Sequence, residues 1–187
     1  RRGGLERAGR RLAHPIAFLL VAVLVAGTPA LAQWLRGRTA PLPSFILVSL
    51  DTLRADRLGL YGCELPTSPQ LDALGEESIV FERAIAQAPN TPPSHMSIFT
   101  SLYPTLHGFF GSGDRLAGWR LTLTEYLREA GYRTLATTDG AFMRGWFGFG
   151  QGFETYDDRD KGIAQSVPLI FDWLDGGIAR ERYFIFL

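Results

Sequence analysis

Short apolar runs divide the chain and predict strands that are buried on both faces of a sheet. Residues 45–50 read FILVSL, with β-branched residues among them, and the charged Asp51 follows directly. Residues 132–138 and 183–187 are further runs of this kind. Apolar runs of roughly four to eight residues are typical of strands covered on both faces, as in parallel sheets. Residues 79–81 are a candidate for a shorter additional strand.

Helix signals occur between these runs. Ser68 offers an N-cap before Pro69 at the first helical position, a combination that favours helix initiation. The helix that follows should turn Leu71 and Leu74 inward. A second helix is predicted over residues 93–101, where apolar positions continue after two prolines.

A capping box marks the start of a third helix. Thr122 and Glu125 have the spacing in which each side chain accepts a hydrogen bond from the other residue's backbone N–H. The helix should end at Gly131, since glycine adopts the conformation that closes many helices. Its expected inward face consists of Leu123, Tyr126, Leu127 and Ala130. A fourth helix over residues 165–174 would hold Pro168 in its first turn.

Strands that alternate with helices predict an α/β fold with a mainly parallel sheet and helices on both faces. In such sheets ligands bind beyond the carboxyl ends of the strands. Asp51 directly follows the first predicted strand. We therefore expect it at the edge of the sheet where chemistry takes place.

An export signal is predicted near the N-terminus. Residues 15–27 are an uncharged apolar run, preceded by arginines and followed by Ala30 and Ala32 at the small positions of a cleavage site, which is the pattern of a secretory signal. A membrane-spanning helix needs roughly 20 apolar residues. If the apolar segment is taken to extend over residues 15–35, it is long enough to be an uncleaved anchor in the inner membrane. This anchor is one alternative to a cleaved signal, and a buried core helix is the other.

Charge and composition refine this division. The 187 residues include 19 basic and 19 acidic side chains, but residues 1–32 carry five arginines against one glutamate, a net charge of +4 that leaves −4 for the rest. Residues 1–32 are thus expected to be a signal peptide or signal anchor, and residues 33–43, with two prolines, a linker. A basic flank stays in the cytoplasm, so the body would be exported, periplasmic or extracellular. Without a basic excess no nucleic-acid partner is expected, and a single cysteine excludes a disulfide scaffold.

Two segments carry residues suited to ester chemistry. Asp51 is a hard oxygen ligand at a strand end, where a divalent cation can be held. Thr91 stands near a helix N-terminus, whose dipole favours an anion. An alcohol is a weak nucleophile unless a base or metal lowers its pKa, and a metal held by Asp51 beside Thr91 would allow attack on a phosphate or sulfate ester. The same residues also fit an N-cap and a simple turn.

Five motifs follow one another along residues 44–187. They read LVSLDTLRADRLGLYG, TSPQLDAL, FERAIAQAPNTPPSHMSIFTSLYPTLHG, TLTEYLREAGYRT and FGFGQGFETYDD. In this order they resemble the sulfatase family, within the alkaline-phosphatase-like superfamily. The resemblance implies the N-terminal portion of a catalytic domain, truncated at its C-terminus, with further metal ligands beyond residue 187. A longer protein is also expected because residue 1 is not methionine and residues 183–187 read as the middle of a strand.

The resemblance implies roles for individual residues. The family's opening strand ends in acidic metal ligands; Asp51 matches the first, and Thr52 stands where the second is often Asp. The family's nucleophile lies in a C/S-x-P-S-R motif, in which Thr91 occupies the nucleophile position and His95 the arginine position. Asp51, Thr52 and Thr91 are therefore the implied metal ligands, and Thr91 and His95 the implied catalytic residues. His95 would steady charge on the transferred group or on Thr91, or simply make a local helix hydrogen bond.

A threonine at position 91 changes the expected chemistry. Threonine is not the usual precursor of formylglycine, and here it resembles the phosphodiesterase and phosphoglycerol-transferase branches, in which threonine attacks phosphorus directly. The expected function is an exported metal-dependent hydrolase of an anionic sulfate or phosphate ester. The cation would be calcium in a true sulfatase, and zinc or manganese in a phosphodiesterase-like enzyme. The alternative is a non-catalytic, membrane-tethered relative that binds anions.

Other polar residues near these motifs are expected to have structural roles. His107 should be a buried, hydrogen-bonded histidine at a turn. Asp56 should cap the turn that follows it rather than support the site, and Cys63 should be a small buried residue. Asp139 is expected in a loop at the mouth of the site.

Overall fold

Four parallel strands form the centre of the structure, a computed structural model that describes residues 42–111 and 113–187. Their order across the sheet is β1-β4-β2-β3, and every neighbouring pair is parallel. The strands are β1 (Phe45–Leu47), β2 (Arg133–Thr137), β3 (Thr155–Asp157) and β4 (Tyr183–Phe186). The last strand in the sequence thus lies between the first two, and Phe45 pairs with Phe184.

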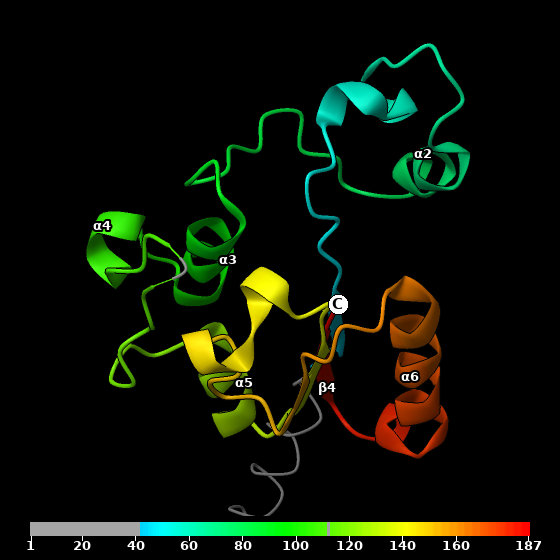
Figure 1. The fold of residues 1–187 in the computed structure, drawn as a ribbon. Helices are drawn as coiled ribbons and strands as arrows, with labels where there is room; N and C mark the ends of the chain where they lie inside the picture. Colours follow the sequence, from blue (N-terminus) through cyan, green and yellow to red (C-terminus); the bar gives the residue numbers. More distant parts are fainter. Residues whose placement is uncertain (1–41, 112) are drawn as a thin grey trace, which may run out of the picture. The chain divides into compact units, whose positions relative to one another are not determined.

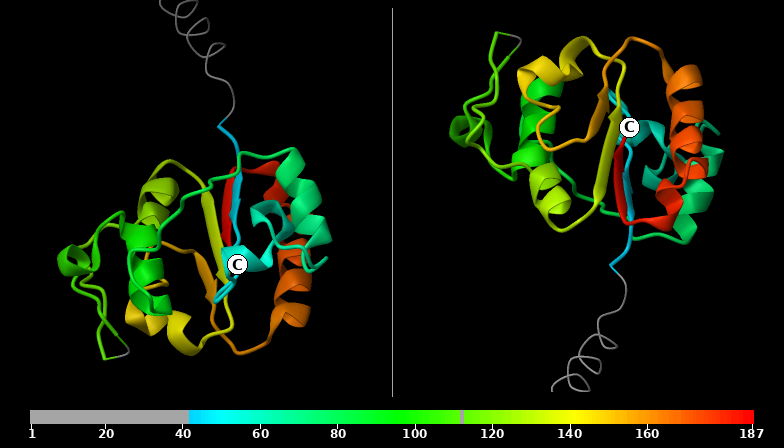
Figure 2. Two further views of the ribbon diagram at one scale, coloured as in Figure 1. Left: turned by 90° about the horizontal axis from the view of Figure 1, so that it is seen from above. Right: turned by 90° about the horizontal axis from the view of Figure 1, so that it is seen from below.

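Helices cover both faces of this sheet. Helices α3 and α5 lie on one side and α6 on the other (Figures 1 and 2). The helices are α2 (Pro69–Glu76), α3 (Thr91–Thr100), α4 (Pro104–His107), α5 (Leu123–Glu129) and α6 (Ile163–Asp175), with short 3₁₀ turns at Ala55–Arg57, Gly59–Tyr61, Ala141–Met143, Gly145–Phe147 and Ile178–Arg180. The arrangement confirms the predicted α/β class.

The core consists of one apolar cluster on each face, because successive residues of a strand point to opposite sides. Phe184 and Phe186 of β4 pack towards α3 and α5, where the Phe186 ring meets Phe99 edge to face at 5.1 Å between centroids. Ile185 points the other way and packs with Ile170 of α6. Both faces of β4 are therefore covered, as its continuous apolar run predicted.

Residues Ser44–Leu187 form one compact unit. The predictions for residues 1–32, for membrane attachment through residues 15–35 and for most of the linker at 33–43 lie outside the described residues. Within residues 42–111 and 113–187, no helix has the length and apolar character needed to cross a bilayer.

Helix α5 begins as predicted but presents a different face. Thr122 and Glu125 form both hydrogen bonds of the capping box, and Gly131 has the expected positive φ of 83°. Tyr126, however, is 58% exposed, and Thr124 is buried in its place. The start of α5 lies so close to Gly152 that a Cβ there would stand 2.6 Å from the Glu125 nitrogen, so this close approach requires glycine.

The segment around α2 departs further from the prediction. Leu74, expected to point inward, is 62% exposed. Residues 79–81 form no strand, and Ile79 is 86% exposed. No strand of the described sheet pairs with this segment. An apolar pattern predicts a strand only where a neighbouring strand can supply the hydrogen bonds.

Four further elements differ from the prediction. The first strand ends at Leu47, before Asp51 is reached. Helix α6 begins at Ile163, so Pro168 lies beyond its first turn, where it leaves the carbonyl of Ala164 without its usual N–H partner. Strand β3 and helix α4, with three and four residues, are too short to show a periodic pattern.

Candidate active site

A cleft of about 680 Å³ opens at the carboxyl ends of β1, β2 and β4. Its walls are formed by the chain after β1, the first turns of α3, the loop that follows β2, the end of β4 and the start of α6. The polar residues that line it are Ser49, Asp51, Thr52, Thr91, His95, Thr137, Thr138, Asp139 and Ser166. The cleft therefore lies where a parallel α/β sheet is expected to bind its ligands.

The structure brings Thr91 and Asp51 together, although they are 40 residues apart in the sequence. The Thr91 hydroxyl lies 3.1 Å from Oδ2 and 3.2 Å from Oδ1 of Asp51. The same Oδ1 accepts a hydrogen bond from the Thr52 backbone N–H at 3.0 Å. Because a carboxylate only accepts hydrogen bonds, Thr91 donates its proton to Asp51. The lone pairs of the Thr91 oxygen are thereby left available.

Thr52 lines the cleft with an unusual backbone conformation. Its φ is 58°, in the left-handed region that β-branched residues rarely adopt. Such a conformation costs about 1–2 kcal/mol. It turns the chain sharply after β1 and allows the Thr52 N–H to hold the Asp51 carboxylate. Backbone strain of this kind is concentrated at functional sites.

His95 lies one helical turn after Thr91 and is only 7% exposed. Its Nδ1 lies 2.9 Å from the Thr91 carbonyl oxygen, and its Nε2 lies 2.7 Å from Ser49 Oγ. A carbonyl only accepts, so Nδ1 carries the proton, and in the neutral ring Nε2 accepts from the Ser49 hydroxyl. His95 thus contacts the backbone of Thr91 rather than its hydroxyl. This is the local helix hydrogen bond expected as one alternative, together with a contact to Ser49 that the sequence did not suggest.

The oxygen donors of the cleft suit a hard divalent cation. Asp51 and Thr91 point at one another, Asp139 also lines the cleft, and no Lys or Arg is among the lining residues. Carboxylate and hydroxyl oxygens are the ligands that such a cation prefers. Within the described residues, no group of three or more His, Cys, Asp or Glu side chains is placed to hold a metal. Asp51 and Thr91 could thus form only part of the coordination shell of such a cation.

The start of α3 is poor in hydrogen-bond donors for an anion. Thr91, Pro92 and Pro93 are its first three residues, and proline has no backbone N–H. The N–H of Ser94 donates to the Asn90 carbonyl at 3.2 Å. The first N–H groups of a helix usually bind an anion. In α3 the two prolines lack this group, and the N–H of Ser94 is already hydrogen-bonded within the helix. The start of α3 therefore offers an anion fewer N–H donors than most helix starts do.

His107 has the structural role that the sequence predicted. It is buried at the end of α4, where Nδ1 accepts from the Phe109 N–H at 3.1 Å and Nε2 lies 3.1 Å from the Ser97 hydroxyl. Because Nδ1 accepts, Nε2 carries the proton of the neutral ring. Burial lowers the pKa of His107, which favours this neutral form.

Of the predictions for Asp56, Cys63 and Asp139, only the one for Asp139 agrees fully with the structure. Asp56 neither caps a turn nor reaches the cleft; it forms an exposed ion pair with Arg54 at 2.7 Å, because the two side chains lie two residues apart on one loop. Cys63 is half-buried rather than fully buried, at 3.8 Å from the Thr67 hydroxyl. Asp139 lies in the loop after β2 and lines the cleft, as expected.

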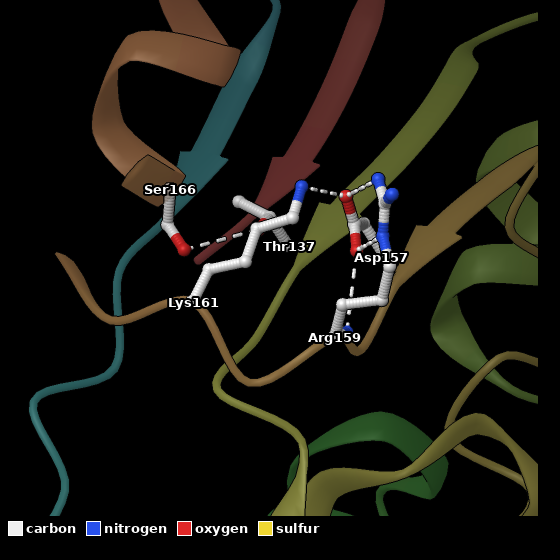
Figure 3. A network of polar contacts seen from close by, with 5 residues as sticks. All are labelled: Thr137, Asp157, Arg159, Lys161 and Ser166. Carbon is white, nitrogen blue, oxygen red and sulfur yellow. Dashed lines mark hydrogen bonds and ion pairs between the residues drawn. The ribbon is translucent and has the colours of Figure 1, made fainter. Parts of the chain in front are cut away.

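A buried carboxylate beside this region was missed by the sequence analysis. Asp157 ends β3, and Figure 3 shows the side chains of Arg159 and Lys161 converging on it. Arg159 donates at 2.7 and 2.9 Å, and Lys161 at 2.5 Å. These contacts, Arg159 above all, hold the pKa of Asp157 well below its usual range. The alternating Asp-x-Arg-x-Lys spacing after a short apolar segment was the available signal.

Replacing Asp157 with asparagine should destabilise the fold by about 2 kcal/mol at neutral pH, since two cations would lose a charged partner. The folded-state pKa of Asp157 is depressed, so its stabilisation is present above the unfolded-state pKa of about 4 and is lost as the pH falls through the folded value. Urea unfolding at neutral and acidic pH would measure this. Asp160→Asn, an exposed neighbour, is the control. The prediction would be contradicted if both variants lost the same free energy of unfolding. It would also be contradicted if the difference in stability between the wild type and Asp157→Asn were as large at acidic pH as at neutral pH.

Comparison with known proteins agrees with the resemblance seen in the sequence. The model of the sulfatase family matches residues 43–168, more than half of the chain. An arylsulfatase of Clostridium perfringens is 32% identical over 93 residues, which are 49% of this chain and 19% of that relative. Iduronate 2-sulfatase of Homo sapiens is 35% identical over 94 residues, 49% of this chain and 17% of that relative. The chain thus spans less than a fifth of the length of these relatives.

Solved structures share the fold. A protein in complex with its substrate D-glucosamine-2-N,6-O-disulfate matches 78% of this chain and 34% of its own, with a TM-score of 0.65 and 20% identity. The phosphonate monoester hydrolase of Agrobacterium radiobacter matches 75% of this chain and 30% of its own, with a TM-score of 0.54 and 21% identity. The C-terminal periplasmic domain of EcEptC from Escherichia coli, in complex with zinc, matches 79% of this chain and 43% of its own, with a TM-score of 0.59 and 19% identity. These structures show the shared fold, and the family match over residues 43–168 shows that the chain belongs to the sulfatase family.

Proposed function

We propose that this chain carries the nucleophile half of the active site of an exported, metal-dependent hydrolase that cleaves sulfate or phosphate esters. The observation that carries the proposal is the contact between the Thr91 hydroxyl and both carboxylate oxygens of Asp51, at 3.1 and 3.2 Å, inside the cleft. It places an alcohol beside a carboxylate at the edge of the sheet where ligands bind.

The chemistry follows from the two side chains. Thr91 Oγ1 forms a bond to the phosphorus or sulfur atom while its proton passes to the Asp51 carboxylate. The bond from that atom to the ester oxygen breaks, and the leaving oxygen departs with the electron pair and takes up a proton from water. Asp51 accepts the hydroxyl hydrogen bond and so orients Oγ1 with its lone pairs towards the cleft. A divalent cation held by Asp51 and Thr91 would lower the pKa of the alcohol and offset charge on the transferred group. Water then releases the product from Thr91.

Threonine at position 91 favours a phosphorus ester over a sulfate ester. Formylglycine arises from cysteine or serine in the family motif that this sequence resembles, and residue 91 is neither. Among the proteins that share the fold, one is a phosphonate monoester hydrolase and another is bound to a sulfated glucosamine. The fold is therefore compatible with both ester classes, and the nucleophile supports the phosphorus branch.

Export is the part of the proposal that rests on the sequence alone. The basic residues before the uncharged run at 15–27, with Ala30 and Ala32 after it, are the pattern of a secretory signal or a signal anchor. The proposed location is the periplasm or the extracellular space, with attachment to the inner membrane through residues 15–35 if the segment is not cleaved.

A substrate panel tests the proposed function. The full-length protein, loaded in turn with calcium, zinc or manganese, would be assayed on an aryl sulfate, an aryl phosphate diester and an aryl phosphonate monoester. We expect cleavage of a phosphorus ester that depends on the added cation and stops with a chelator. Cleavage of the sulfate alone would overturn the role given to Thr91. No cleavage together with no bound metal would favour the non-catalytic, anion-binding alternative.

A further inference from the structure

Ser49 lines the cleft but has no role in the proposed reaction. It lies two residues before Asp51, and its backbone N–H donates to the Leu187 carbonyl at 2.7 Å. Leu187 in turn donates to the Leu47 carbonyl at 2.9 Å. The backbone of Ser49 is thus tied to the sheet at the end of β4, while the residues that follow it turn away to form the wall of the cleft.

The Ser49 side chain reaches from this anchored strand end to α3. Its hydroxyl lies 2.7 Å from Nε2 of His95, 46 residues further along the chain. The other ring nitrogen of His95 donates to the Thr91 carbonyl at 2.9 Å. The rings of His95 and Phe186 meet edge to face, with 6.3 Å between their centroids. The imidazole is therefore fixed by a polar contact at each nitrogen and by an aromatic neighbour.

These contacts form a chain that ends at the nucleophile. It runs from the end of β1 through the Ser49 hydroxyl and the His95 ring to the backbone of Thr91. Thr91 belongs to the first turn of α3, and Asp51 belongs to the segment after β1. The contacts of Ser49 and His95 join these same two segments, so they help to determine how far Thr91 lies from Asp51. A displacement of about 1 Å in a catalytic site can lower the rate about a hundredfold.

We propose that Ser49 is a positioning residue, which acts through His95 to hold Thr91 against Asp51. The expected effect on the rate rests on the proposed function, whereas the hydrogen bond between Ser49 and His95 can be tested without it. It requires the Ser49 hydroxyl to donate and His95 Nε2 to accept, which fixes the proton of the neutral ring on Nδ1. His107 has the opposite arrangement, with the proton on Nε2, so it provides a reference in the same molecule.

Nitrogen NMR of histidine in the full-length protein tests the structural part. The signals of His95 and His107 are assigned by replacing each residue. We expect opposite tautomers for the two rings in the wild type. Ser49→Ala should change the His95 signals and leave those of His107 in place, and Ser49→Thr, which keeps the hydroxyl, should restore them. His95 signals that are unchanged in Ser49→Ala would overturn the inference.

Kinetics test the effect on rate. Ser49→Ala should lower kcat roughly 10- to 100-fold and change KM little, because a misplaced nucleophile slows the reaction without removing contacts to the substrate. Ser49→Thr should recover most of the rate. The control is Ser78→Ala, an exposed serine whose hydroxyl donates to the Leu74 carbonyl, and its kcat should match the wild type. Altered His95 signals with an unchanged kcat would overturn the positioning role, whereas a wild type that cleaves no ester would count against the proposed function instead.

Discussion

Thr91→Val should lower the kcat of ester hydrolysis by about 1,000-fold or more, the scale of loss seen when a nucleophile is removed from a hydrolase. Valine keeps the β-branched shape of threonine and removes only the hydroxyl that lies 3.1 Å from Asp51. Thr91 is half-buried at the first position of α3, so the substitution should leave the helix intact. Steady-state kinetics on the best ester of the substrate panel would measure the effect.

A second threonine of the same helix provides a matched control. Thr100 lies at the other end of α3, where its hydroxyl donates to the Met96 carbonyl at 2.7 Å. Thr100→Val should keep kcat within about twofold of the wild type, as expected for a substitution that does not touch the reacting atoms. A Thr91→Val variant that turns over at the wild-type rate would show that another group attacks the ester.

Asp51→Asn should weaken both cation binding and turnover. Asparagine has the same shape as aspartate and retains one oxygen, but it lacks the charge that a hard divalent cation requires. We expect the affinity for the activating cation to fall more than about 100-fold, beyond the losses typical of residues that only support a ligand. Isothermal titration of the metal-free protein would measure the affinity, and activity at saturating cation would show the effect on kcat.

Asp160→Asn serves as the control for this variant, because it removes the same charge from an exposed position. It should bind the cation with the affinity of the wild type. Two results would refute the assignment of Asp51: an Asp51→Asn protein with unchanged cation affinity, or an Asp160→Asn protein with an equal loss. The second result would mean that net charge, rather than coordination, controls the binding.

The sequence predicted those parts of the fold that local patterns determine. The apolar run of β4 and the capping box of α5 were found because each signal lies within a few consecutive residues. The expected inward positions of Leu74 and Tyr126 were wrong because burial depends on what lies opposite a side chain. The three residues of β3 were missed because so short a segment has no measurable period.

In the candidate site, too, some features follow from local sequence patterns and others depend on contacts between distant residues. Asp51 and Thr91 could be paired in advance because a strand end and a helix start belong to one edge of a parallel sheet. The contact between Ser49 and His95 could not be predicted, since it depends on the rotamers of two side chains 46 residues apart. The ion pairs of Asp157 depend in the same way on how the chain folds back after β3.

The order of strands in the sheet has a consequence for how the protein folds. Within the described residues, β1 pairs with β4, and the partners Phe45 and Phe184 are 139 residues apart. At the usual speed of a ribosome, the first strand waits roughly ten seconds or more before its partner has been synthesised. Contacts between distant parts of a chain also form slowly, because the intervening loop must first be closed. The carboxylate that follows β1 and the threonine of α3 should therefore meet late in folding, when β4 has joined β1.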